Sequence, residues 1–382
     1  QYCADQEGAY AHWLDAVPIW WSERLGGAVV VRYDDVRRVM TEHAAFGQSP
    51  IYDGAFVDAF SGPTLPALDP PEHNVLRRTI AQHFTARMIE ENFSETVRTI
   101  VEGIVEEFDG PRFEIYSDFT DKLVCRVAAV LIGGDMGDPA LLAEHNAAVI
   151  AYMRTTRERL NATAEQAVGK QAGDALISYL SGLYDDRAGR GVDSPDLLTA
   201  LARSGASKDD AVRLAALSLV AGVDTTVRGI ANTLYALLRH PDQLQRVKAE
   251  PALVDLAFAE GLRWMTPISL KHRYVRADTE LCGVRLSRGD HACVLLGAAN
   301  RDPRKYDRPE EFRLERKGPK HLAFGVGIHY CLGAPLATLE ARHALQVLLR
   351  RFPGLHADLS SVEFRDGPAN RSPHRLVIEG GE

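Results

Sequence analysis

The strongest chemical signal of the chain is the ten-residue segment F-G-V-G-I-H-Y-C-L-G at positions 324–333. Gly325 and Gly327 permit positive φ angles and let the backbone pass close to a flat group. Cys331 stands just before leucines with helical spacing that continue to Arg351. Amide N–H groups at a helix start favour a thiolate over a thiol. A thiolate on a glycine-rich loop suits a metal, and an axial cysteine on haem iron is one such arrangement, with a buried inert cysteine as the alternative.

A second signal is an acid followed by two hydroxyl residues in the middle of an apolar stretch. Asp224, Thr225 and Thr226 directly follow the mostly apolar run Leu214–Val223. Hydroxyl side chains can hydrogen-bond back to the preceding turn of a helix, which accounts for threonine in such a place. A buried aspartate is costly unless it has a partner. The sequence therefore singles out Asp224 as a candidate functional residue.

Two charged pairs with helical spacing are weaker signals. Glu260 and Arg263 are three residues apart, and His73 and Arg77 are four apart, after an Asp-Pro-Pro helix start. Pairs of this kind are most often solvated and contribute little. The spacing alone therefore does not distinguish a functional pair from a surface pair.

The amino-acid composition excludes several classes of protein. The 382 residues are 46% hydrophobic and 25% charged, which is enough to build a sizeable core and excludes a disordered chain. The net charge of −8 argues against binding to nucleic acid. Five widely spaced cysteines without a C-x-x-C pair argue against a disulfide framework or a structural zinc site. The longest mostly apolar run is about half the length of a membrane span, and no secretory pattern precedes it, so we expect a cytoplasmic protein.

The elements that must position these residues are mainly helical. Apolar positions predict a helix over 85–108, and Ser207 with Asp210 predicts the start of a long helix that ends near His240-Pro241. Strand patterns are short, at 28–31, 279–286 and 291–296, and residues 287–290 suggest a hairpin turn between the last two. No repeat or linker divides the chain. We expect a single domain over 1–382, mainly α with small β appendages, and a functional loop at 49–71.

The segment with Cys331 resembles the haem-ligand loop of the cytochrome P-450 family, and further landmarks extend the resemblance from about residue 20 to the end. It implies the cytochrome P-450 fold, with a long central helix over a haem and the Cys-ligand loop beneath. Cys331 matches the axial thiolate of heme b (iron protoporphyrin IX). Asp224 matches the residue that relays protons, and Thr225 matches the residue that hydrogen-bonds dioxygen.

The resemblance also implies roles for other positions. Glu260 and Arg263 match the E-x-x-R pair, selected by position because Pro267 and a strand pattern follow, and they would form a buried structural cluster with Phe312 and Arg316. Cofactor contacts would come from His73, Arg77, Arg273 and His329 at the haem propionates and from Phe324, Gly325 and Gly333 in the loop. The substrate pocket would include the 49–71 loop, Leu217, Val220, Ala221, Ile268, Ser269, Leu270 and residues near Asn370.

The activity that the resemblance implies is a haem-thiolate monooxygenase. It would insert one oxygen atom from O₂ into an apolar small organic substrate, by hydroxylation or oxidative dealkylation. Electrons would come from a separate ferredoxin or flavodoxin-like donor with its reductase, because no such module fits within this chain. The alternatives are a peroxide-driven peroxygenase on the same fold and a catalytically silent haem scaffold protein, both of which fit less well with an intact Asp224-Thr225 pair. Aromatic, terpenoid and macrolide-like substrates all stay open.

Two departures from the family pattern concern the surface. Cys282 stands where a glycine is common, and Thr338 stands where many members carry an arginine, which removes one positive charge from the expected donor-docking face. That face would still be positively charged, since the segments expected to border it contain Arg77, Arg78, Arg342, His343, Arg350 and Arg351.

Overall fold

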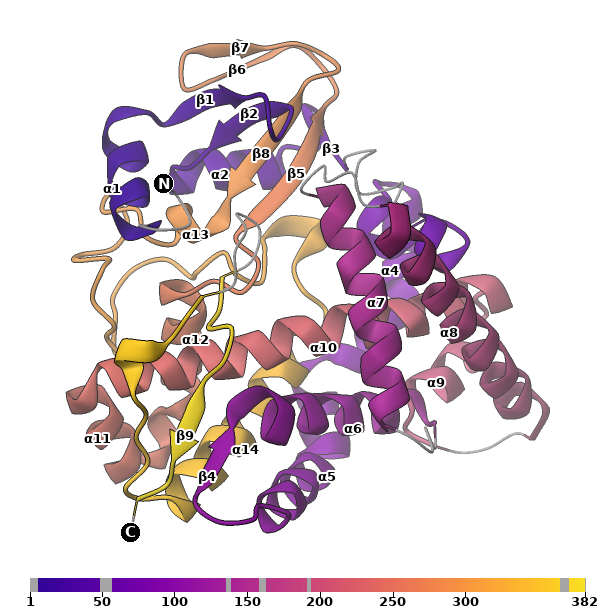
Figure 1. Ribbon diagram of the computed structural model, residues 1–382. Coiled ribbons are helices and arrows are strands. Elements are labelled where there is room, and N and C mark those ends of the chain that lie inside the picture. The colour runs from indigo at the N-terminus through magenta and orange to yellow at the C-terminus, as the bar shows by residue number, and fades with distance from the viewer. Residues whose placement is uncertain are drawn as a thin grey trace.

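A long helix through the middle of the molecule organises the fold (Figure 1). The computed structural model describes residues 6–48, 57–134, 139–157, 163–190, 194–364 and 371–381. The central helix, α10 (Lys208–Arg239), has 32 residues and is therefore about 48 Å long at about 1.5 Å per residue. The Ser207 hydroxyl accepts a hydrogen bond from the Asp210 amide at 3.1 Å, which caps the helix where the sequence predicted. Among the described residues, α10 is the one helix long and apolar enough to cross a membrane, but 72% of its apolar window is buried.

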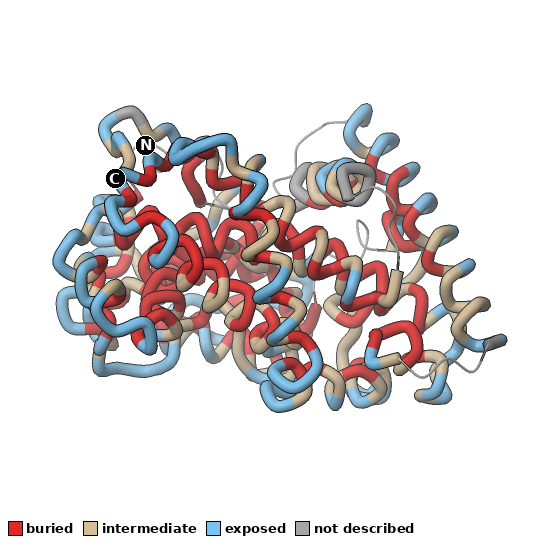
Figure 2. The backbone as a smooth tube through the Cα atoms, turned by 90° about the horizontal axis from the view of Figure 1, so that it is seen from below, coloured by how far each residue is buried: buried red, intermediate tan, exposed pale blue. Residues whose placement is uncertain are grey.

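The other helices pack around α10 and bury one large apolar core, seen as the red interior in Figure 2. The amphipathic pattern over 85–108 forms α5, which begins after the capping residue Thr85. The expected mainly α fold with small β appendages is confirmed. The helices are α1 (Gln6–Ala16), α2 (Tyr33–Thr41), α4 (Glu72–Ala81), α5 (Ala86–Glu106), α6 (Asp121–Ile132), α7 (Pro139–Arg157), α8 (Thr163–Arg190), α9 (Leu197–Arg203), α11 (Pro241–Ala249), α12 (Val254–Trp264), α13 (Leu296–Ala299) and α14 (Ala334–Arg351), with short 3₁₀ turns at 65–67, 82–84, 251–253, 327–329 and 359–361 and a π-helical turn at 115–120.

A five-stranded sheet at one end of the molecule forms a second packing unit with α1 and α2 (Figure 1). Its strand order is β1-β2-β8-β5-β3, and only the β2–β8 pair is parallel. The strands are β1 (Ile19–Ser22), β2 (Gly27–Val30), β3 (Phe46–Gly47), β5 (Leu270–Val275) and β8 (His291–Leu295). Two-stranded pairs form from β4 (Arg112–Glu114) with β9 (Val377–Glu379) and from β6 (Thr279–Leu281) with β7 (Val284–Leu286).

One prediction about the strands was wrong. Residues 279–286 are not one strand that pairs with 291–296 across a turn at 287–290. They form a hairpin by themselves, because Cys282 and Gly283 both have positive φ angles, 51° and 76°, and make the two-residue turn. Strand β8 pairs with β5 instead, and this pairing fixes the position of the strand that carries Arg273.

Candidate active site

A mostly apolar cavity lies between α10 and the cysteine loop. Its wall includes residues from α4, α6, α10, α12, β5 and α14, together with the segment from Ala323 to Gly333. Cys331 and Thr225 both line this space, although they are more than a hundred residues apart in the sequence. The fold therefore brings Cys331 and the threonine of the acid–threonine pair to one cavity.

The cysteine loop has the backbone that its glycines predict. Gly325 and Gly327 have φ angles of +72° and +76°, a region that favours glycine. The amide of Cys331 donates to the carbonyl of Phe324 at 2.8 Å, which closes the loop. Helix α14 then begins at Ala334, with Gly333 as its capping residue. Cys331 is thus held at the start of a helix by a short, locally closed turn.

Cys331 is exposed to the cavity, but the protein around its sulfur raises the pKa of the thiol, because desolvation disfavours the thiolate. The amides of Gly333 and Ala334 and the charges of Lys271 and Arg77 act in the opposite direction. The helix-start effect expected from the sequence is therefore present but weaker than desolvation. A cation at the sulfur would reverse the balance, since metal coordination stabilises the deprotonated form.

The other described cysteines do not line the cavity. Cys125 is buried in α6, where burial raises the pKa of its thiol to about 12. Cys293 is buried in β8, with its sulfur 3.3 Å from Nδ1 of His272. Cys282 donates to Asp35 in the surface hairpin. Among the described residues, Cys331 is the cysteine in a position to bind a group in the cavity.

The residues expected at the haem propionates lie together. The rings of His73 and His329 are 4.3 Å apart, and the buried Nε2 atom of each has no hydrogen-bond partner among the described residues. Arg77 and Arg273 line the same cavity. Burial lowers the pKa of His73, and burial with nearby cations lowers that of His329 to about 2. Two guanidinium groups and two buried imidazole nitrogens without partners fit a pair of carboxylates, so the site suits haem.

On α10, the structure separates the two residues of the acid–threonine pair. The Thr225 hydroxyl lines the cavity and donates to the Ala221 carbonyl at 2.9 Å. Asp224 does not line the cavity. Both of its carboxylate oxygens accept hydrogen bonds from Arg228, at 2.7 and 2.8 Å, and Arg228 also donates to Ser372. The half-buried aspartate therefore has an ion-pair partner, which offsets the cost of its partial burial.

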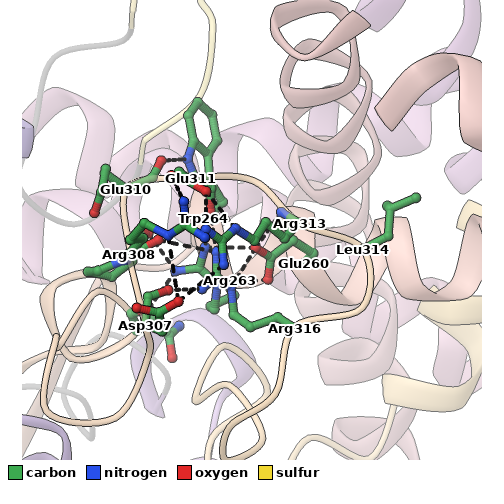
Figure 3. Close-up of polar contacts among 12 residues, drawn as sticks. Glu260, Arg263, Trp264, Asp307, Arg308, Glu310, Glu311, Arg313, Leu314 and Arg316 are labelled. Carbon is green, nitrogen blue, oxygen red and sulfur yellow. Dashed lines mark hydrogen bonds and ion pairs between the residues drawn. The ribbon is translucent and has the colours of Figure 1, made fainter. Parts of the chain in front are cut away.

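Glu260 and Arg263 form the centre of a buried polar cluster outside the cavity (Figure 3). The Glu260 carboxylate accepts from Arg263 at 2.7 and 2.8 Å and from Arg316 at 2.9 Å. Arg263 donates further to the carbonyls of Asn300, Pro309 and Glu311. These contacts join α12 to the chain between residues 300 and 316.

Only some of the residues expected at the substrate pocket line the cavity. Leu217, Ala221 and Ile268 line the cavity. Val220, Ser269 and Leu270 do not line it, because Val220 and Leu270 pack into apolar cores and the Ser269 hydroxyl donates to the Thr266 carbonyl. From the 49–71 loop, Leu65 and Pro66 reach the wall, whereas residues 49–56 and Asn370 lie outside the described residues.

Sequence reasoning missed three residues near this site. Arg228 lies one helical turn after Asp224, which is a signal for an ion pair. Lys271 is two residues before Arg273 on a strand, so the two share a face. Glu340 lines the cavity from α14, and no signal in its helical pattern sets it apart from a surface acid.

Comparison with known proteins decides the family. The family model described as "Cytochrome P450" matches residues 192–367. The cytochrome P450 monooxygenase PikC of Streptomyces venezuelae is 37% identical over 308 residues, which cover 77% of this chain and 70% of that protein. The chain belongs to the cytochrome P450 family. The biotin biosynthesis cytochrome P450 of Bacillus subtilis is 34% identical, over 78% of this chain and 74% of that protein.

Solved structures of cytochromes P450 have the same fold. The epothilone D-bound cytochrome P450epoK aligns with a TM-score of 0.91 at 26% identity, over 100% of this chain and 97% of that one. The relatives are named monooxygenases and hydroxylases, so this cytochrome P450 is an oxidoreductase that uses haem and molecular oxygen on a small substrate, with electrons from redox partners.

Proposed function

We propose that this cytochrome P450 binds haem through Cys331 and inserts one oxygen atom into a C–H bond or next to a heteroatom of an apolar small molecule. The observation that supports it best is the shared cavity of Cys331 and Thr225. Bound haem supplies the activation of dioxygen. The protein supplies the thiolate, the carboxylate contacts of His73, Arg77, Arg273 and His329, and an apolar wall that excludes water.

The polar groups of α10 would supply protons. The Thr225 hydroxyl donates its hydrogen to Ala221, so its oxygen keeps lone pairs that can accept a hydrogen bond from a water in the cavity. Asp224 sits one residue away, on the side of the helix that contacts Arg228. Proton transfer between them would need water or a rearrangement of the Asp224–Arg228 pair.

The names of the relatives leave the substrate class open. One is a 6-deoxyerythronolide B hydroxylase and another a C-19 steroid 1alpha-hydroxylase, so family membership does not decide between macrolide and steroid compounds. The apolar wall from Leu217, Ala221 and Ile268 supports a substrate with an apolar body. Hydroxylation or oxidative dealkylation would both fit.

We also propose that the chain acts as a single haem domain in the cytoplasm and takes electrons from a separate ferredoxin or flavodoxin-like protein with its reductase. The test is product formation from a compound that shifts the haem absorption band. Purified enzyme with such a donor and ¹⁸O₂ should give product that carries one ¹⁸O atom. Product with hydrogen peroxide alone, and none with the donor, would support a peroxygenase. No product from either supply, with haem bound, would support a silent scaffold protein.

A further inference from the structure

A second hydroxyl side chain, that of Ser218, lies on the cavity side of α10. Within residues 214–226 the helix is buried except at five positions, and four of these line the cavity, namely Ser218, Ala221, Gly222 and Thr225. Ser218 and Thr225 are seven residues apart, which is about 20° short of two full turns, so they face the same side of the helix. Their Cα atoms are therefore about 10 Å apart along its axis.

The helix leaves room for a ligand between these two hydroxyl groups. Gly222 lies one turn after Ser218, and a Cβ atom added there would meet no segment outside the helix within 4 Å. Ala221 beside it carries only a methyl group and also lines the cavity. An apolar molecule can therefore lie along α10, with one end at Ser218 and the other at Thr225.

The Ser218 hydroxyl is placed to accept a hydrogen bond from such a molecule. It donates to the Leu214 carbonyl at 2.8 Å, as Thr225 donates to the carbonyl one turn before it. With the hydrogen bound to the helix, the oxygen keeps lone pairs that can accept. A serine that only bonds back to the preceding turn is the alternative, and it would contribute nothing to ligand binding.

The donor that Ser218 would accept from is neutral. Leu214 and Leu217 line the cavity beside it, and a charged group loses its hydration at a large cost among apolar side chains. Glu340 is the one acidic side chain on the described wall, and it lies on α14. Burial raises the pKa of Glu340 well above the usual range, which favours the neutral acid, so it offers no counter-charge to an ammonium group.

We propose that Ser218 is a specificity-determining residue that accepts a hydrogen bond from a hydroxyl group of an otherwise apolar substrate. The substrate would lie along the cavity side of α10, with this hydroxyl about 10 Å from the carbon that is oxidised beside Thr225. The inference rests on the proposed function and narrows its substrate class to alcohols whose hydroxyl group is remote from the oxidised carbon.

The test uses imidazoles, because an imidazole nitrogen binds iron and so fixes one end of the probe at the haem. 1-(ω-Hydroxyalkyl)imidazoles of increasing chain length are compared with 1-(ω-methoxyalkyl)imidazoles, which cannot donate a hydrogen bond. Dissociation constants are measured on the holoenzyme from the shift of the haem absorption band and by calorimetry, for the wild type, Ser218→Ala and Ser218→Thr. Thr99→Ala is the control, because the Thr99 hydroxyl donates to the Glu95 carbonyl on α5 and does not line the cavity. Haem content and the absorption of the reduced carbon-monoxide complex are recorded for every variant.

We expect the ratio of hydroxyl to methoxy affinity to be about threefold to tenfold higher in the wild type and the control than in Ser218→Ala, as a neutral hydrogen bond predicts. This difference should peak at one intermediate chain length, and Ser218→Thr should keep it. Alanine is a better helix former than serine, so Ser218→Ala should retain its fold and its haem. Equal ratios in the wild type and Ser218→Ala at every chain length would overturn the inference, and so would a difference that does not depend on chain length. A wild type without the thiolate absorption would overturn the proposed function itself.

Discussion

At the scale of single residues, the proposed haem site depends on a cysteine whose surroundings oppose its ionisation. Burial raises the pKa of the Cys331 thiol, and the nearby amides and cations compensate only in part. Such a site holds a thiolate when a cation is bound to the sulfur and a thiol when it is not. In the proposed function, the loop would position Cys331 as the ligand, and bound iron would favour the deprotonated sulfur.

Replacing Cys331 by serine should remove the red-shifted absorption of the reduced carbon-monoxide complex, because an alcohol does not give a thiolate bond to iron. The measurement is the difference spectrum of the purified variant. Cys282→Ser is a matched control, since Cys282 lies in the β6–β7 turn and donates to Asp35, as serine also can. A thiolate signature that survives in Cys331→Ser would contradict the assignment of the ligand.

Thr225→Ala should leave haem content and substrate affinity unchanged but lower the product formed per electron. A positioned group for proton transfer contributes about 10² to 10⁴ in rate, so we expect turnover to product to fall by about 10²-fold, with electrons diverted to peroxide or water. Peroxide and product are measured against NAD(P)H consumed. Thr225→Ser keeps the hydroxyl and should restore most of the coupling. Unchanged coupling in the alanine variant would mean that protons arrive by another route.

At the scale of elements, one turn of α10 carries both the Asp224–Arg228 ion pair and the Thr225 hydroxyl of the cavity wall. The Arg228 side chain is 7% exposed and the Asp224 side chain 21%, and Arg228 also reaches Ser372 before β9. Burial lowers the pKa of Arg228, but the charge and hydrogen bonds of Asp224 outweigh it, so that the pKa is raised. The pair ties the central helix to the C-terminal segment and holds the acid outside the cavity.

Arg228→Met should therefore destabilise the protein by about 3 to 5 kcal/mol, because it leaves a charge in a partly buried place without its partner. In catalysis, Asp224→Asn should slow turnover more than it alters the amount of product formed per electron. The double variant Asp224→Asn/Arg228→Met should recover much of the lost stability, since both charges are then gone. Urea unfolding of the holoenzyme measures the three free energies. Additive effects of the two substitutions would show that the pair is not coupled.

Local signals explain which elements could be predicted. The start of the central helix after Ser207 and its end near His240 could be predicted from the sequence, because capping residues and apolar runs are local features of a few residues. The hairpin at 279–286 could not be predicted, because its turn needs Cys282 to adopt a positive φ angle, which is uncommon for a residue other than glycine. The wall residues Val220 and Leu270 were misplaced for another reason. Helix rotation and strand pairing decide which side chains reach a cavity, and both depend on distant segments.

At the scale of the whole molecule, the cavity lies where the helical core meets the sheet. The α12 end of this junction is held by the Glu260–Arg263–Arg316 cluster, which links α12 to the segment 300–316 (Figure 3). Segment 322–333 continues from there to Cys331. The cluster is outside the cavity wall, which agrees with a structural role, and we expect its loss to affect haem retention rather than proton delivery.

The surface charges near the cysteine loop also differ from the sequence expectation. Arg342 is bound by Asp255 at 2.7 and 2.8 Å and by Glu90 at 2.9 Å, and Arg350 is paired with Glu102. These arginines contribute less to a positive docking face than their number suggests. Charge reversal at Arg342 would also break ion pairs inside the protein, so it would not test docking alone.

Arg78 is the better probe of the electron donor. It is exposed and forms no ion pair with a described residue, and its neighbour Arg77 donates to the Tyr330 carbonyl at 2.7 Å, which places α4 beside the cysteine loop. Arg78→Glu should slow reduction by an acidic ferredoxin about threefold or more at low salt, because complementary charge raises the encounter rate. The control Arg285→Glu makes the same change of charge on the β6–β7 hairpin and should have little effect on the reduction rate.

The difference in reduction rate between the two variants should shrink as salt rises, since charges are screened over about 8 Å at physiological ionic strength. Stopped-flow reduction at two salt concentrations decides the matter: equal rates for both variants would remove electrostatic docking at α4 and leave the haem chemistry unaffected.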